Sequence, residues 1–301
     1  MRITYGTRQH TIDVTSICNT LKHYNIITIP ADDNIRAQYF TDPLYGVLKS
    51  IFITIDNTTT EYGNVTIFIN TDTNTVHTTG MFDPYSTKTI TTKIEDIHRQ
   101  LKIYYGSFME ELPEQKMVVR YLTGNENVLE IGGNIGRNSM IIAHILGENQ
   151  KNLVVLESDS IISNQLKENR ELNNMSFHIE NSALSKRPLI QRGWDTIVSY
   201  KVLNGYKAVK CITYDELLDK YGIQFDTLVL DCEGAFYYIL QDMPEILQNI
   251  KLIIMENDYT DITHKSYIDN VLNTHHFYVD YVESGGWGPC YNKFFEVWKR
   301  L

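Results

Sequence analysis

The sequence predicts an α/β protein whose C-terminal two-thirds forms a doubly wound, mostly parallel sheet. From residue 126 onward, short apolar runs alternate with stretches of helical apolar spacing. This is the pattern of parallel strands buried between helices. The last two runs, "FYVDYVES" and "NKFFEVWKR", are separated only by a Gly-rich loop, so we expect an antiparallel hairpin at the end of the sheet.

Each element of this sheet domain has its own signal. The strands are predicted at "NVLEIG", "NLVVLES", "SFHIENSALS", "DTLVLDCEG" and "LIIMEND", and the helices at 137–147, 160–173, "TYDELLDKY", a stretch ending near 248, and 261–274. The segment "LSKRPLIQRGWDTIVSYKVLNGYKAV" is longer than a plain connection requires.

The N-terminal part has a different composition. Residues 1 to about 80 contain β-branched runs such as "NIITIPADD" and "NVTIFINTD" between Asx- and Gly-rich turns, which predicts a small β-rich domain. We expect "IDNTTTEYGNVTIFIN" to form a hairpin closed near Gly63. Residues 83–122 have helical spacing that ends at Gly124. We place the domains at 1–85 and 86–301.

Composition narrows the class of protein. The net charge of −10 argues against a broad nucleic-acid surface, which needs clustered Lys and Arg. No apolar run approaches the ~20 residues of a membrane span, and the N-terminus lacks a signal-peptide core. The four cysteines form no CxxC pair. We therefore expect a cytoplasmic protein of the producing or host cell. The 20 tyrosines fit biased codon usage, as in a virus or AT-rich microbe, as well as carbohydrate binding.

The stretch "VLEIGGNIGRNSM" predicts a ligand-binding turn after the first strand of the sheet. Its glycines do not have the G-x-G-x-x-G spacing of a dinucleotide site. Glu130 precedes them, and a carboxylate there repels a pyrophosphate but suits a cation. Glu157 ends the next strand, where an acid accepts the hydroxyls of a ribose. Together these acids predict an S-adenosylmethionine site. The alternative is a Gly-rich bend in an unrelated α/β domain.

These motifs, with "VVLESD", "NSALS", "ITYDELLDKYGIQFDTLVLDCEGAFYYIL" and "IIMEND", resemble the FkbM family of O-methyltransferases in order over about residues 100–298. The resemblance implies a Rossmann-like class I methyltransferase fold that uses S-adenosylmethionine. Two positions depart from the family pattern: Val229 replaces a lysine and Phe236 replaces an acid. The residues expected to bind the cofactor are Glu130, Gly132, Gly133, Asn134, Gly136, Asn138, Glu157, Ser158, Ser182, Ala183 and Asp231.

Methyl transfer to an alcohol needs an aligned acceptor and a group that takes its proton. Asp231 is the expected base and Glu233 its partner, although Glu233 also suits the first turn of the following helix. His264 is a weaker candidate base. Cys232 is interpreted as a core residue. No spacing demands a metal ion, and we predict none. The residues expected to contact the acceptor are Asn257, Asp258, Trp287 and Tyr291.

Three functions remain open at this point. The first is an O-methyltransferase for a sugar hydroxyl, in a glycan or a nucleotide-linked sugar; the sugar comes from the resemblance alone. The second is an RNA or cap methyltransferase, which a basic pocket of Lys186, Arg187 and Arg192 would favour. The third is an inactive module that binds carbohydrate or oligomerises. The N-terminal domain would position a polymer, form a homodimer or only stabilise the fold.

Overall fold

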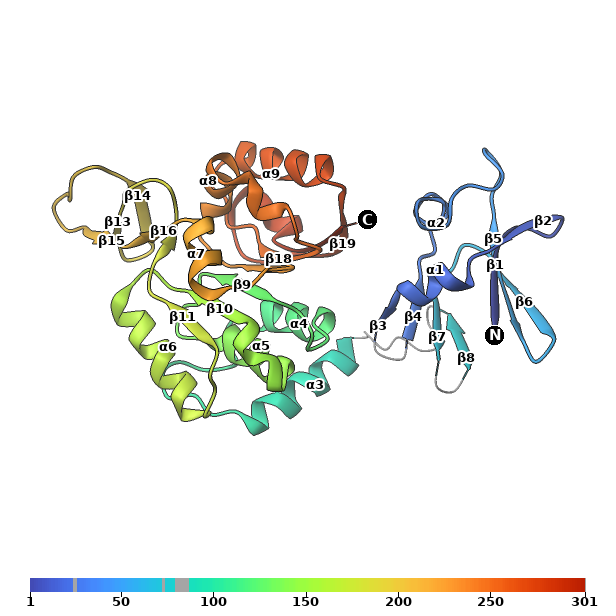
Figure 1. Cartoon of the computed structure of the whole chain (residues 1–301), viewed down its shortest axis with the longest axis horizontal. Coiled ribbons are helices and arrows are strands. Elements are labelled where there is room, and N and C mark those ends of the chain that lie inside the picture. The colour runs from blue at the N-terminus through green and yellow to red at the C-terminus, as the bar shows by residue number, and fades with distance from the viewer. Residues whose placement is uncertain (24–25, 72–73, 79–86, 301) are drawn as a thin grey trace. The chain divides into compact units, whose positions relative to one another are not determined.

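The structure, a computed structural model, describes residues 1–23, 26–71, 74–78 and 87–300. These divide into two compact units, Met1–Thr89 and Ile90–Leu301 (Figure 1). Each unit has its own hydrophobic core. None of the helices in the described ranges is long and apolar enough to span a membrane.

The C-terminal unit is built on a seven-stranded sheet with the order β11-β10-β9-β17-β18-β20-β19. The strands are β9 (Val128–Ile131), β10 (Leu153–Leu156), β11 (His178–Glu180), β17 (Thr227–Leu230), β18 (Leu252–Glu256), β19 (Phe277–Glu283) and β20 (Phe295–Arg300). The pairs from β11 to β18 are parallel, while β20 pairs antiparallel with both β18 and β19. This confirms the predicted doubly wound sheet and its antiparallel C-terminal hairpin.

Helices cover both faces of this sheet (Figure 1). One face packs against α3 (Thr87–Gln100), α4 (Leu112–Tyr121), α5 (Arg137–Leu146) and α6 (Ser160–Leu172), and the other against α7 (Tyr214–Tyr221), α8 (Ala235–Asp242) and α9 (Ile262–Thr274). Three short 3-10 helices are η1 (Gly147–Asn152), η2 (Pro244–Leu247) and η3 (Gly288–Lys293). The central strands between these layers, β9, β10, β17 and β18, are mostly apolar, because both of their faces are buried.

The single helical stretch expected over 83–122 is wrong as a continuous element. Two helices, α3 and α4, are separated by an irregular segment with Gly106 at φ 75°, and Pro113 lies in the first turn of α4. Proline favours the first turn of a helix, and glycine adopts positive φ without strain. The apolar spacing continues through the break, which is why periodicity does not detect it. Residues 83–86 lie outside the described ranges.

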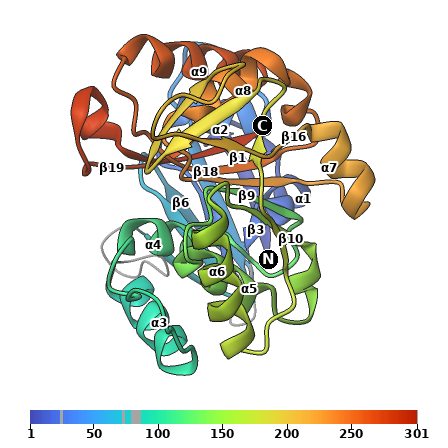
Figure 2. The same ribbon diagram turned by 90° about the vertical axis from the view of Figure 1, so that its left-hand side faces the viewer.

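The long segment between the third and fourth parallel strands forms a small sheet of its own. Its strands are β13 (Leu189–Arg192), β14 (Asp195–Val198) and β15 (Lys207–Val209), antiparallel in the order β14-β13-β15. The segment leaves and returns through two paired strands, β12 (Ala183–Leu184) and β16 (Cys211–Ile212). Figure 2 turns this insertion toward the viewer.

The N-terminal unit contains two four-stranded antiparallel sheets, ordered β2-β1-β5-β6 and β3-β4-β7-β8. Its elements are β1 (Arg2–Thr7), β2 (His10–Asp13), α1 (Thr15–Thr20), β3 (Lys22–His23), β4 (Ile26–Ile29), α2 (Asp33–Phe40), β5 (Ser50–Ile55), β6 (Thr58–Tyr62), β7 (Ile67–Asn70) and β8 (Thr75–Thr78). Isoleucines of both sheets meet in one core with Phe40 of α2. The unit is therefore β-rich, with two short helices that the sequence did not predict.

The hairpin predicted near Gly63 is wrong. Strand β6 pairs with β5, whereas β7 belongs to the other sheet. The tight turn lies instead at Asp56 and Asn57, which have φ values of 47° and 66°. Two consecutive residues with positive φ make the turn that matches the twist of a hairpin. The segment between β6 and β7 connects the two sheets. It is held by the buried Arg36, whose guanidinium donates to the carbonyls of Gly63 and Val65 at 2.8 Å.

A buried carboxylate joins β11 to the insertion and to α7. Glu180 is 1% exposed and accepts hydrogen bonds from Lys210 (2.9 Å), Tyr221 (2.9 Å), Ser182 (2.7 Å) and Lys220. Burial by itself raises the pKa of Glu180, but these four donors outweigh it and lower the pKa to about 2.

We expect Glu180→Gln to lower the free energy of unfolding by about 2 kcal/mol at pH 7, because charged hydrogen bonds are lost. The depressed pKa stabilises the fold fully above the ordinary value of 4.5, and this contribution disappears as the pH falls toward about 2. Urea unfolding at several pH values measures the difference, which should shrink on acidification. The exposed Glu171→Gln is the control; a difference independent of pH would contradict the assignment.

Candidate functional site

A cavity of about 740 Å³ lies at the carboxyl ends of β9, β10, β17 and β18. Its other walls come from the first turn of α4, from α8 and from strands β13 and β14 of the insertion. In an open α/β sheet, ligands bind at this edge, where the strand order reverses. Here the reversal falls at β9, since β10 and β17 lie on its two sides.

The three glycines after β9 are required by close packing within the protein. Gly132 has φ 92°, and a Cβ there would lie 1.6 Å from the carbonyl oxygen of Asp231. A Cβ at Gly133 would lie 2.1 Å from the side chain of Val155, and one at Gly136 would lie 2.3 Å from a leucine of α6. The glycines thus let this turn contact β10, the β17 turn and α6, which places its backbone at the cavity wall.

Glu157 is fixed at the cavity by the glycine turn. One carboxylate oxygen accepts a hydrogen bond from the backbone N–H of Asn134 at 2.9 Å, and the other accepts from that of Asp159 at 2.8 Å. Asn134 has φ 47°, a left-handed conformation that asparagine tolerates. Burial raises the pKa of Glu157. Each oxygen retains a lone pair, so the carboxylate still has room to accept a hydroxyl of a ligand.

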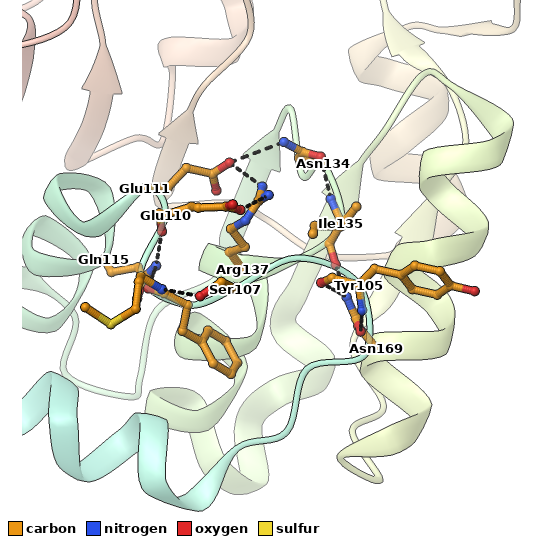
Figure 3. A network of polar contacts seen from close by, with 11 residues as sticks. Tyr105, Ser107, Glu110, Glu111, Gln115, Asn134, Ile135, Arg137 and Asn169 are labelled. Atoms are coloured by element: carbon orange, nitrogen blue, oxygen red, sulfur yellow. Dashed lines mark hydrogen bonds and ion pairs between the residues drawn. The ribbon is translucent and has the colours of Figure 1, made fainter.

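The segment between α3 and α4 is fastened beside the same turn (Figure 3). The buried side chain of Asn169 accepts from the backbone N–H groups of Tyr104 (2.8 Å) and Tyr105 (3.1 Å), and it donates to the carbonyl of Ile135 at 2.9 Å. One asparagine on α6 therefore holds both the segment and the turn.

The end of that segment places Glu111 at the cavity. Arg137 at the start of α5 donates to Glu111 at 2.6 Å and also pairs with Glu110, and Asn134 Nδ2 donates to Glu111 at 3.2 Å (Figure 3). Burial raises the pKa of Glu111, while the Arg137 charge opposes the shift. Sequence patterns did not single out this glutamate, because it precedes α4 as an ordinary helix-start acid.

Carboxyl groups dominate the polar lining of the cavity. The acidic residues that line it are Glu111, Glu114, Glu157, Asp231, Glu233, Asp242 and Glu256. Arg187 is the only Lys, Arg or His among the described lining residues, and it forms a two-point ion pair with Asp242 at 2.6 and 2.7 Å. The cavity therefore offers no unpaired cation to a phosphate.

The acids of β17, β18 and α4 repel one another. Burial and the charges of Glu111 and Glu114 raise the pKa of Asp231 well above its ordinary value. Burial, a hydrogen bond with Glu114 and the charge of Asp231 raise the pKa of Glu256 to about 11. Among the residues that the structure describes, no three His, Cys, Asp or Glu side chains are grouped to hold a metal ion.

Asp258 stands behind Glu233. It accepts a hydrogen bond from the backbone N–H of Gly234 at 2.9 Å. Burial, then the charge of Glu233 and a hydrogen bond with it, raise the pKa of Asp258 to about 7. Glu233 lies in the turn after β17, and Asp258 follows the end of β18. Their contact stabilises the backbone conformation of Glu233, which has a positive φ of 51°.

The predicted site residues fall into two groups. Those that line the cavity are Gly132, Asn134, Glu157, Ser158, Ser182, Ala183, Asp231 and Glu233. Those that do not line it are Glu130, Gly133, Gly136, Asn138, Asn257, Asp258, His264, Trp287 and Tyr291. The side chain of Glu130 is 3% exposed, and burial raises its pKa to about 8.

The residues outside the cavity have other contacts. His264 stacks on the ring of Tyr237 with a centroid distance of 3.8 Å. Asn257 is buried and donates to the carbonyl of Lys293 at 2.7 Å. Trp287 and Tyr291 are about half exposed. Their proposed contacts with an acceptor stay predictions.

The basic pocket that would favour RNA does not form from the three cations considered. Lys186 pairs with Glu245 at 3.1 Å, Arg187 with Asp242, and Arg192 lies 3.8 Å from Asp195. The insertion instead brings an aromatic residue to the cavity: Trp194, at the turn between β13 and β14, is 60% exposed and lines it.

No family model matches the chain, and no curated protein matches it. Among solved structures, the chain is similar to an O-methyltransferase from Bacillus cereus in complex with SAH (12% identity, 74% of this chain and 94% of that chain, TM-score 0.40). It is also similar to the O-methyltransferase TomG from Streptomyces achromogenes, involved in tomaymycin synthesis and in complex with SAM (13%, 70% and 89%, 0.40). A third is an rRNA methylase from Streptococcus thermophilus (8%, 66% and 99%, 0.39). Likenesses this distant assign neither cofactor nor acceptor to the chain.

We expect Gly132→Ala to destabilise the protein by about 3 kcal/mol or more, because a Cβ collides with the Asp231 carbonyl at a residue with positive φ. Gly222→Ala is the matched control: Gly222 has φ 66° but no atom within 4 Å of its Cβ position, so only the backbone cost of about 1 kcal/mol applies. Thermal and urea unfolding compare the two. Equal losses would show that the contact with Asp231 is dispensable.

Proposed function

We propose that the chain is an S-adenosylmethionine-dependent O-methyltransferase of the FkbM type that acts on a sugar hydroxyl. The observation that carries the proposal is the lining of the cavity: the glycine turn, Glu157, the Ser182–Ala183 segment and Asp231 converge on one hollow at the carboxyl edge of the sheet. The sugar and the FkbM family rest on the sequence resemblance.

The charge of the cavity supports this cofactor over a dinucleotide. A pyrophosphate needs free cations or an exposed helix N-terminus, whereas here Arg187 is paired and acids surround the turns. The cofactor's ammonium and sulfonium suit such a lining, and Glu157 would accept hydrogen bonds from the ribose hydroxyls. When bound, S-adenosylmethionine supplies an activated methyl group.

The protein's own residues would bind the cofactor, remove the proton of the acceptor hydroxyl and orient the acceptor. Glu157 and Asn134 would hold the cofactor's ribose, and Ser182 and Ala183 would contact its adenine. Asp231 takes the proton of the acceptor hydroxyl, since its raised pKa increases its basicity. Glu233, supported by Asp258, orients the acceptor. The insertion and α8 limit access of water to the cavity.

We expect calorimetric titration to show that S-adenosylmethionine and its demethylated product bind the wild type. Glu157→Ala should weaken both by about tenfold or more, because hydrogen bonds to a charged group are worth about 1.5–3 kcal/mol. Glu95→Ala, at an exposed position of α3, is the control. Absence of binding to the wild type would contradict the proposed function.

Asp231→Asn should separate binding from turnover. It should retain affinity for the demethylated product while methyl transfer to a panel of sugars falls about a hundredfold or more. Because burial and neighbouring acids raise the pKa of Asp231, its basic form is lost on acidification, so wild-type turnover should rise with pH. Transfer of radiolabelled methyl groups measures both effects. Undiminished turnover in the variant would remove Asp231 from its assigned role.

A further inference from the structure

The negative charge of the cavity is only partly compensated by the protein. Glu111 pairs with Arg137, Asp242 pairs with Arg187, and Glu157 accepts two backbone N–H groups. Among the described residues, neither a cation nor an N–H donor pairs with the lining carboxyls of Glu114, Asp231, Glu233 and Glu256.

Glu114 is the most informative of these four. It lies in the first turn of α4, lines the cavity, and is 8% exposed. Its carboxyl contacts that of Glu256, and its Oε2 atom is buried and has no hydrogen-bond partner among the residues that the structure describes. A buried carboxyl oxygen without a partner is costly unless a ligand satisfies it. A donor that carries positive charge satisfies it best.

The cofactor of the proposed function does not balance this charge by itself. S-adenosylmethionine carries an ammonium, a sulfonium and a carboxylate, so its net charge is a single positive one. If Glu114 and Glu256 share one proton, the four carboxyls still carry more negative charge than the cofactor neutralises. A second cation would therefore bind favourably, and an anionic acceptor would be repelled.

We propose that the acceptor is an amino sugar, whose protonated amino group is held by Glu114 and Glu256 while its hydroxyl faces Asp231. The inference rests on the proposed function and narrows its substrate class. It disfavours a nucleotide-linked sugar, since two phosphates would face uncompensated carboxyls. Trp194, exposed on the insertion, offers an aromatic face to the apolar side of a sugar ring.

The test uses two probes with the same sugar backbone, which differ in whether their amino groups are free and protonated or acetylated and neutral. A tetrasaccharide of β-1,4-linked glucosamine and its fully N-acetylated counterpart are titrated into the full chain saturated with the demethylated cofactor product, at a pH where the free amine is protonated. We expect the glucosamine form to bind about tenfold or more tightly than the acetylated form.

Variants assign the preference to the two carboxyls. Glu114→Gln should bring the two affinities to within about threefold, and Glu256→Gln provides a second test should the first variant fold poorly. Glu95→Gln should keep the wild-type preference. Affinity for the demethylated product, measured in parallel, should stay unchanged in Glu95→Gln, and in the two cavity variants it checks that the cofactor side of the site still forms.

The outcomes separate this inference from the function on which it rests. If the demethylated product binds but the two sugars bind equally, the acetylated form binds more tightly, or neither sugar binds, the amino-sugar inference is overturned and the methyltransferase proposal stands. If the demethylated product itself fails to bind the wild type, the proposed function is overturned and the amino-sugar inference falls with it.

Discussion

The contact between the turns that follow β9 and β17 is the constraint on which the cavity depends. The two strands are neighbours in register, Asp231 donates its backbone N–H to Ile131 at 3.1 Å, and only a glycine at 132 clears the Asp231 carbonyl. This approach places a carboxyl on one side of the hollow. It also lets the glycine turn continue to Asn134, which fixes Glu157 on the other side. One steric condition thus positions both walls.

The same geometry explains why like charges gather at this edge. Parallel strands end together, so an acid after β17 and an acid at the end of β18 become neighbours whatever their distance in the sequence. The apolar layers on both faces of the sheet keep the strands in place against the repulsion. Buried acids with raised pKa values are common at functional sites, and Asp231 and Glu256 are two such acids beside the cavity.

The sequence predicts the parts of this fold that depend on local pattern. Strands that are buried on both faces have mostly apolar sequences. The glycine turn and Glu157 follow two strands that are consecutive in the sequence, so their proximity can be predicted. Other features arise only from tertiary contacts. Glu114 is an ordinary helix-start acid until α4 packs beside β18, and the sheet of the insertion has no distinctive periodicity. The predicted hairpin near Gly63 is wrong because the chain turns at Asp56 and Asn57, which both have positive φ and join the paired strands β5 and β6.

The insertion begins and ends at neighbouring points of the chain, because Ala183 of β12 pairs with Cys211 of β16. Residues can be added to or removed from it without changing the register of the seven-stranded sheet. The part of the cavity lining that carries Trp194 can therefore change in length and sequence, while Glu157, which follows β10 of the seven-stranded sheet, keeps its position. In the proposed methyltransferase, selectivity for the acceptor could then evolve separately from recognition of the methyl donor.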